Sequence, residues 1–195
     1  MPTDPGAADG LAGRIASRLA RRRARRVDPS LAAAAVLLPL VRRDDLWRLV
    51  LTRRARTLRR QPGDFAFPGG MVEPGDDSAL GAALRESREE IGLDPARVRV
   101  LGRLDERRTY HGFRLSAFPV EIGPGARLAP GPEVEEIFEI PWIALPEMEQ
   151  TSVERLPVGP DGELRSRVIF RYPFEGRDVW GLTARLIRDL LDVAA

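Results

Sequence analysis

Runs of apolar residues divide the chain into expected strands and helices. Residues 32–41 form one continuous apolar run, typical of a strand buried on both faces. Residues 46–54 alternate between apolar and polar, as expected of an antiparallel partner reached through a turn at 42–45. Further strands are expected at 97–104, 113–122, 134–140 and 166–173, and helices at 11–26, 78–92 and 181–193. Strands dispersed around well-marked helices predict a single-domain α/β sandwich.

Residues 78–92 also carry the signals of helix ends. Asp77 or Ser78 can accept a hydrogen bond from the N–H groups of the first turn. Gly92 can adopt the left-handed conformation that ends a helix. The expected helix therefore follows directly on the Gly/Pro-rich segment 67–75.

Three carboxylates, Glu86, Glu89 and Glu90, lie together on this helix beside its apolar stripe, with Glu90 nearest the stripe. Clustered carboxylates raise each other's pKa values unless a cation lies among them. Mg²⁺ or Mn²⁺ would satisfy such a cluster, because both take oxygen ligands. Arg85, four residues before Glu89, is expected to orient that carboxylate. The alternative is an ordinary charged helix face with an Arg85–Glu89 pair.

Composition excludes several kinds of site. The chain has no cysteine, so a disulfide, a thiolate zinc site and a thiol nucleophile are excluded. Its net charge of +2 is uneven, with +9 over residues 1–70 and −7 over residues 71–195. This asymmetry predicts polyphosphate binding at one edge and metal binding at the other.

The N-terminal segment is basic, ending in RRRARR at residues 21–26. We interpret it as a solvated helix rather than a nucleic-acid or membrane arm, because it lacks interleaved aromatic residues. Residues 1–30 are therefore expected to be a partly disordered basic extension, and residues 1–26 to be dispensable for activity. The apolar run 31–41 is too short to span a membrane, and we see no secretory signal. A cytoplasmic protein is expected, with no nucleic-acid or membrane partner.

Two adjoining segments resemble one enzyme family. Residues 70–93, GMVEPGDDSALGAALRESREEIGL, resemble the Nudix box, with a loop one residue longer and Asp76 or Asp77 at the position of its first Glu. Residues 50–70, VLTRRARTLRRQPGDFAFPGG, resemble the signature of the coenzyme A (CoA) diphosphatase branch of Nudix hydrolases. The end of the chain, 179–191, is also similar to that branch, so the resemblance covers about residues 31–192.

The resemblance implies a Nudix-type α/β/α sandwich with a mixed sheet over residues 31–195. It also implies metal-dependent hydrolysis of the diphosphate of CoA or its derivatives, giving 3′,5′-ADP and 4′-phosphopantetheine. Mg²⁺ or Mn²⁺ would be held by Glu86, Glu89 and Glu90, with Arg85 supporting them. Substrate would be bound by Arg54, Arg59, Gly69 and Gly70.

A further catalytic carboxylate is expected from the segment GPEVEEIFEIPW. We rank Glu133 first and Glu136 second, because Nudix enzymes often supply an extra ligand or base from such a loop. His111, the only histidine, is expected to be a surface residue of a turn rather than a catalytic one. Two other functions stay open: a Nudix diphosphatase for ADP-ribose or dinucleotides, and a non-catalytic Nudix-fold regulator. A homodimer is also open.

Overall fold

The computed structural model describes residues 10–59, 61–158 and 163–195, with residues 156–158 and 163–165 described by their backbone alone. The helices are α1 (Gly10–Ala20), α2 (Ala79–Ile91), α3 (Leu145–Met148) and α4 (Gly181–Ala194), with short 3-10 helices at Pro95–Arg97 and Trp142–Ala144. The larger sheet contains β1 (Ala33–Arg43), β2 (Leu46–Arg54), β3 (Phe65–Ala66), β4 (Gly69–Met71), β5 (Val98–Val100), β6 (Arg107–Arg108), β7 (Arg114–Ile122) and β8 (Val134–Pro141). The smaller sheet contains β9 (Gln150–Val158), β10 (Glu163–Phe174) and β11 (Arg177–Trp180).

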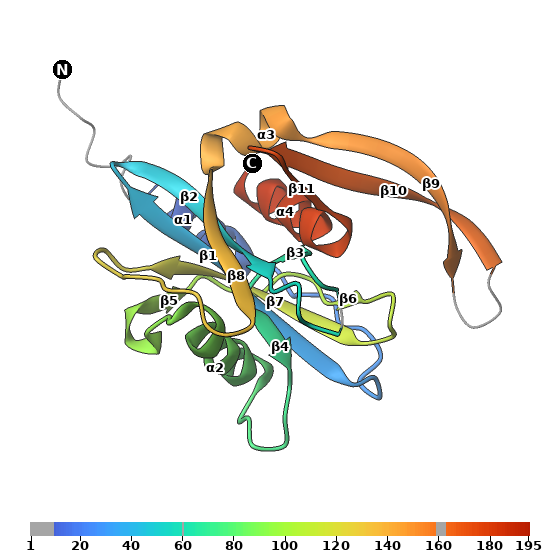
Figure 1. Ribbon diagram of the computed structural model, residues 1–195, viewed down its shortest axis with the longest axis horizontal. Coiled ribbons are helices and arrows are strands. Elements are labelled where there is room, and N and C mark those ends of the chain that lie inside the picture. Colours follow the sequence, from blue (N-terminus) through green and yellow to red (C-terminus); the bar gives the residue numbers. More distant parts are fainter. Residues whose placement is uncertain (1–9, 60, 159–162) are drawn as a thin grey trace.

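The larger sheet is mixed and lies between two layers of helices. Its main path runs β3-β2-β1-β7-β5, with β4 beside β1, β6 beside β7 and β8 beside β2. β1 and β7 are parallel, and the other pairs are antiparallel. Figure 1 shows α2 against one face of this sheet and α4 against the other. The predicted α/β sandwich with a mixed sheet is confirmed.

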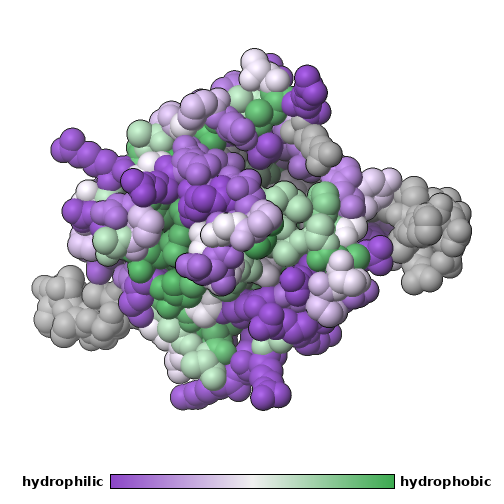
Figure 2. Space-filling view, turned by 90° about the horizontal axis from the view of Figure 1, so that it is seen from below, coloured by the Kyte–Doolittle hydropathy of each residue, from purple (hydrophilic) through white to green (hydrophobic). Residues whose placement is uncertain are grey.

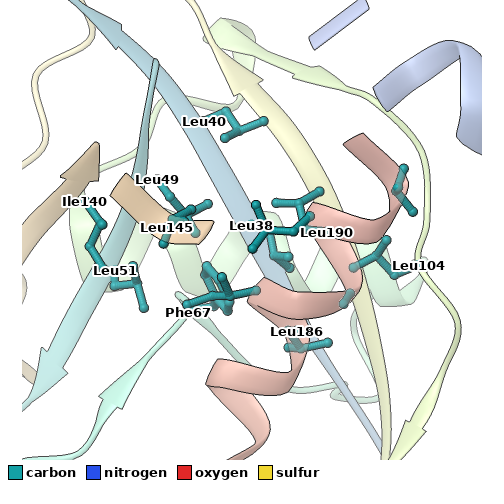
Figure 3. Packing of buried hydrophobic residues seen from close by; sticks show 14 of the residues in the cluster. Leu38, Leu40, Leu49, Leu51, Phe67, Leu104, Ile140, Leu145, Leu186 and Leu190 are labelled. Atoms are coloured by element: carbon teal, nitrogen blue, oxygen red, sulfur yellow. The ribbon is translucent and has the colours of Figure 1, made fainter. Parts of the chain in front are cut away.

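β1 is buried on both faces, which explains its continuous apolar run. Ala35, Leu37 and Val41 point toward α2 and pack with its buried residues. Leu38 and Leu40 point the other way, into the cluster that includes α1 and α4. Figure 3 shows this second cluster, in which leucines from β1, β2 and α4 meet. β1 therefore fixes the positions of both helical layers, and with them the helix that carries the three carboxylates.

The N-terminal helix α1 is part of the core, although its residues precede the expected domain start at residue 31. Its apolar stripe is buried in the same cluster as α4 and consists of Leu11, Ala12, Ile15 and Leu19. The helix ends at Ala20, earlier than the expected end at residue 26, and Arg25 then pairs with Asp105 through both its backbone N–H and its Nε. Removing residues 10–26 would therefore expose part of the core, which argues against the expectation that residues 1–26 are dispensable. Residues 1–9, expected to be disordered, lie outside the described residues.

The smaller sheet extends away from the body of the domain as a long β9–β10 hairpin (Figure 1). The expected strand 166–173 is the inner part of β10, whereas β9 has no counterpart among the expected strands. Val153 on β9 lies opposite Val168 on β10, and both are exposed. A hairpin with little buried surface leaves no strong alternation in its sequence, so β9 could not be read from the pattern.

The face that carries α2 is mainly hydrophilic, with smaller apolar areas between the charged side chains (Figure 2). This surface matches the amphipathic character of α2, whose inner side packs on Ala35, Leu37 and Val50. Among the described residues, no helix is long and apolar enough to cross a membrane.

Candidate active site

The helix α2 begins and ends where its sequence predicts. The Ser78 hydroxyl accepts a hydrogen bond from the Gly81 N–H at 3.0 Å, so Ser78 caps the helix and the alternative, Asp77, does not. Gly92 has a φ of 65°, and its N–H donates to the carbonyl groups of the last turn. Both ends of α2 are therefore fixed, which orients its three carboxylates relative to the sheet.

Glu90 is the buried carboxylate of the site, with 7% of its surface exposed. Its Oε2 accepts a hydrogen bond from the Gly69 N–H at 2.9 Å, and its Oε1 lies 3.9 Å from Nη1 of Arg54. Burial raises the pKa of Glu90 to about 7, against the opposing effects of the Gly69 hydrogen bond and the Arg54 charge. The neighbouring charges of Glu86 and Glu133 raise this pKa further. A cation among these carboxylates would offset the free-energy cost of the buried Glu90 charge.

Arg85 connects the helix to the loop that precedes it. Its Nε and Nη2 donate to the two carboxylate oxygens of Asp76 at 3.0 and 3.1 Å, a bidentate pair. Its Nη1 donates to Glu86 at 2.9 Å and lies 3.6 Å from Glu89. Arg85 therefore holds Glu86 more closely than Glu89, the carboxylate it was expected to orient. Burial raises the pKa of Glu86 despite the hydrogen bond from Arg85.

Two glycines allow the strand β4 to lie against these groups. Gly69 has a φ of +146°, and a Cβ there would lie 2.2 Å from the carbonyl oxygen of Ala35. A Cβ on Gly70 would lie 2.6 Å from the carboxylate of Glu86. Only glycine fits at these positions without displacing β1 or the Glu86 carboxylate.

A cavity of about 410 Å³ is lined by Glu86, Glu89, Glu90, Pro132 and Glu133. Two backbone hydrogen bonds hold the loop on its far side: from Gly131 N to Glu90 O at 2.8 Å, and from Ala55 N to Glu133 O at 2.9 Å. The structure thus brings Glu133 together with the helix carboxylates. The sequence ranks Glu133 ahead of Glu136 for this position.

The alternative, Glu136, instead forms an ion pair with Arg177. Another hollow, of about 420 Å³, lies beside β5 and contains Arg99 and Glu121, which pair with each other. We place the candidate site at the first cavity, because the carboxylates and the glycine-rich strand meet there.

The comparisons with known proteins agree with this arrangement. A family model described as NUDIX domain matches residues 31–160. The chain belongs to the Nudix hydrolase family. A Nudix hydrolase of Photorhabdus laumondii, named uncharacterized Nudix hydrolase NudL, is 38% identical over 166 residues, or 85% of this chain and 86% of that protein. A protein of the same name from an Enterobacter species is 37% identical over 161 residues, covering 80% of each chain.

Solved Nudix structures share the fold. The Nudix hydrolase RenU of M. Smegmatis has a TM-score of 0.50 and 19% identity, covering 67% of this chain and 78% of that one. A C. elegans Ap4A hydrolase in a binary complex also has a TM-score of 0.50, with 16% identity, covering 60% of this chain and 85% of that one. At these identities the likeness shows the Nudix fold alone.

The carboxylates of α2 present oxygen atoms of the kind that hard cations take, but they do not form a closed cage. Within the described ranges, no three carboxylate or histidine side chains converge closely enough to hold a metal ion by themselves. This suits Mg²⁺, which is usually held by one or two carboxylates together with water and substrate phosphates. The donors are all carboxylate oxygens, and Glu90 among them is buried with a raised pKa, which fits a hard divalent cation.

Two predicted residues lie elsewhere in the Nudix domain. Arg59 is exposed in the loop between β2 and β3 and is not among the residues that line the cavity. His111 is exposed in the turn between β6 and β7, beside the ring of Tyr110, as expected of a surface residue.

The contacts of two residues that support the Nudix site could not be predicted from the sequence. Gly131 lies against the end of α2, where a Cβ would be 2.1 Å from the carbonyl oxygen of Glu89. Asp76 clamps Arg85, although the sequence left Asp76 and Asp77 as alternatives for the box position. The Gly–Pro pair at 131–132 signals a turn, but no sequence rule reports that this turn packs on α2.

Proposed function

We propose that this Nudix hydrolase cleaves the diphosphate bond of CoA or a CoA derivative, giving 3′,5′-ADP and 4′-phosphopantetheine or its acyl form. The observation that carries the proposal is the hydrogen bond from Gly69 N to Glu90 Oε2, with Arg54 3.9 Å from the same carboxylate. Gly69 and Arg54 belong to the segment 50–70, which resembles the CoA diphosphatase signature, and Glu90 belongs to the Nudix box. The two motifs therefore meet at one point, where a diphosphate could contact both.

Glu86 and Glu90 would hold Mg²⁺ or Mn²⁺ together with the substrate phosphates, with Glu89 completing the set directly or through water. When bound, the metal would neutralise the charge on the diphosphate and lower the pKa of a coordinated water. The side chain of Arg54 lies beside Glu90 and can donate to a diphosphate oxygen. Arg85 holds Glu86 in place through Asp76, so the ligand position is fixed before substrate arrives.

Glu133 is the proposed general base. It lines the cavity opposite α2, and its backbone is held by the Ala55 N–H. An exposed carboxylate at this position can accept a proton from the attacking water and pass it to solvent. Glu90 is a poorer base, because its buried carboxylate is already committed to the Gly69 N–H and faces Arg54.

A substrate panel tests the proposal. Purified protein would be incubated with CoA, an acyl-CoA, ADP-ribose, NADH and a dinucleoside polyphosphate, each with Mg²⁺ or Mn²⁺, and the products identified by mass spectrometry. We expect the highest kcat/KM with CoA or acyl-CoA and cleavage to 3′,5′-ADP. Glu90→Gln should lower kcat by orders of magnitude, whereas Glu147→Gln on the exposed surface of α3 should not.

The panel also separates the other candidates. Higher kcat/KM with ADP-ribose or a dinucleotide would identify a different Nudix diphosphatase. Binding without turnover of any substrate would favour a non-catalytic regulator. Normal turnover by Glu90→Gln at saturating Mg²⁺ would contradict the assigned role of that carboxylate.

A further inference from the structure

The guanidinium of Arg54 lies beside the buried carboxylate of Glu90 without bonding to it directly. One oxygen of Glu90, Oε2, accepts the hydrogen bond from the Gly69 N–H, and the other, Oε1, lies 3.9 Å from Nη1 of Arg54. That separation is longer than a charged hydrogen bond, so Arg54 offsets the charge of Glu90 without a directional contact. The side chains of Arg54 and Glu90 are 24% and 9% exposed, so water screens their attraction only in part.

The backbone of Arg54 is fixed on both sides, whereas its guanidinium has a donor to spare. The Arg54 N–H donates to the carbonyl of Asp64 at 2.9 Å, and the Arg54 carbonyl accepts from the Gly63 N–H at 3.1 Å. Arg54 also pairs with Val134 at a bulge, where the register between β2 and β8 shifts. Its Nε is buried and has no hydrogen-bond partner within the described part of the chain. The guanidinium can therefore change partners while the backbone stays in place.

The cavity contains more negative than positive charge. Four carboxylates line it: Glu86, Glu89, Glu90 and Glu133. Arg85 is already committed, because it donates to both oxygens of Asp76 and to Glu86. Among the described residues, Arg54 is the one that forms an ion pair with Glu90. A second cation bound by Glu90 would lie close to this guanidinium, and two like charges at such a separation repel each other.

We propose that Arg54 is the counterion of Glu90 in the metal-free protein and is displaced when Mg²⁺ or Mn²⁺ binds. This inference rests on the metal site of the proposed function, but not on CoA as the substrate. The displaced guanidinium stays beside the cavity, because its backbone is held there, and its donors become free for a phosphoryl oxygen. Metal and diphosphate therefore favour each other's binding, since each draws away the competitor of the other.

A Mn²⁺ titration of metal-free protein tests the counterion role without turnover. Free Mn²⁺ would be measured by its EPR signal. Arg54→Gln should bind Mn²⁺ about tenfold more tightly than wild-type protein, because the competing charge is gone. Arg54→Lys keeps the charge and should stay close to the wild-type affinity.

Arg48→Gln is the matched control for this titration. Arg48 is also on β2 and also has a buried Nε without a partner in the described part of the chain, but it does not line the cavity. Its substitution should leave Mn²⁺ affinity unchanged. Equal or weaker Mn²⁺ binding by Arg54→Gln, or the same gain in Arg48→Gln, would overturn the proposal.

Urea unfolding in EDTA at pH 8 tests the metal-free state. Arg54→Gln should lower the urea midpoint, because the charged Glu90 loses its counterion. The same substitution in a Glu90→Gln background should change the midpoint little, because no carboxylate is left to be neutralised. An equal shift in both backgrounds would show that Arg54 stabilises the fold through another contact, and the counterion role would be wrong.

Turnover tests the release of Arg54 toward the substrate. With CoA at saturating Mn²⁺, Arg54→Gln should lower kcat/KM about tenfold despite its tighter Mn²⁺ binding, because the diphosphate loses a charged hydrogen bond. Arg54→Lys should recover part of this loss. Unchanged kcat/KM in Arg54→Gln would overturn the release. Failure of the wild-type protein to cleave CoA, with the Mn²⁺ affinities and urea midpoints as expected, would instead contradict the proposed function alone.

Discussion

The buried carboxylate Glu90 makes stability depend on pH in metal-free protein. Below about pH 4.5 it is protonated in both the folded and the unfolded chain. Above about pH 7 it is charged in both, and the folded state then carries the cost of a buried charge. Because the folded pKa is raised, the folded state binds more protons, so the contribution of Glu90 to stability falls as pH rises through this window.

The size of the effect follows from the pKa. Burial raises the pKa of Glu90 from 4.5 to about 7, and each pKa unit corresponds to about 1.4 kcal/mol. Glu90 should therefore lower the free energy of unfolding by about 3 kcal/mol between pH 4 and pH 8. Glutamine has nearly the same shape and can still accept the Gly69 N–H, but it carries no charge. Glu90→Gln should thus remove this part of the pH dependence.

Denaturant unfolding in EDTA measures the difference directly. At pH 8 the metal-free Glu90→Gln variant should be more stable than wild-type protein by up to about 3 kcal/mol, and at pH 4 the two should be similar. Adding Mg²⁺ at pH 8 should stabilise the wild-type protein and have less effect on the variant. Glu147→Gln serves as the exposed control. Parallel stability curves for wild type and Glu90→Gln from pH 4 to pH 8 would refute the reasoning.

Three further predictions concern groups around the site and in the core. Gly131→Ala should move the loop opposite α2, because the new Cβ would lie 2.1 Å from the carbonyl oxygen of Glu89. Turnover measured by product release should then fall on the order of 10- to 100-fold. Asp76→Asn should weaken the clamp on Arg85 and lower Mg²⁺ affinity or activity by about 10- to 100-fold in a metal titration. Ile15→Ala, in the fully buried part of α1, should lower the free energy of unfolding by about 2–5 kcal/mol in urea.

Matched controls make these outcomes specific. Gly75→Ala adds a Cβ with open space around it and should keep its turnover. Asp45→Asn removes an exposed partner of Arg42 and should not change the metal titration. Val153→Ala truncates an exposed side chain and should change stability by less than about 0.5 kcal/mol. If a control and its test variant behave alike, the assigned contact is not the cause of the effect.

The helix and the central strands could be predicted because their signals are local. Ser78 and Gly92 mark the ends of α2 by their own chemistry, and β1 is a continuous apolar run. The burial of Glu90 was indicated by its place beside the apolar stripe of the helix.

Other features depend on contacts between distant segments. The burial of α1 depends on its packing against α4, whose residues are about 170 positions away in the sequence. The arginines that follow α1 made its short apolar stripe resemble part of a solvent-exposed basic helix. β8 contains a bulge at Glu135, where its register with β2 shifts between Arg53 and Arg54. The pattern of apolar and polar residues within β8 does not predict this shift, because it depends on the partner strand. Arg59 matches the family signature by sequence. Its exposed position depends on the loop between β2 and β3, which is closed by the hydrogen bond from Arg54 N to Asp64 O.

The central position of β1 has a consequence for the order of folding during synthesis. β1 can pair with β2 and β4 once residue 71 has emerged, but its parallel partner β7 ends at Ile122. At about 5–20 residues per second, the ribosome needs roughly 3–10 s to supply those additional residues. One edge of β1 stays unpaired during that interval, so the nascent chain exposes an aggregation-prone strand edge until β7 is translated.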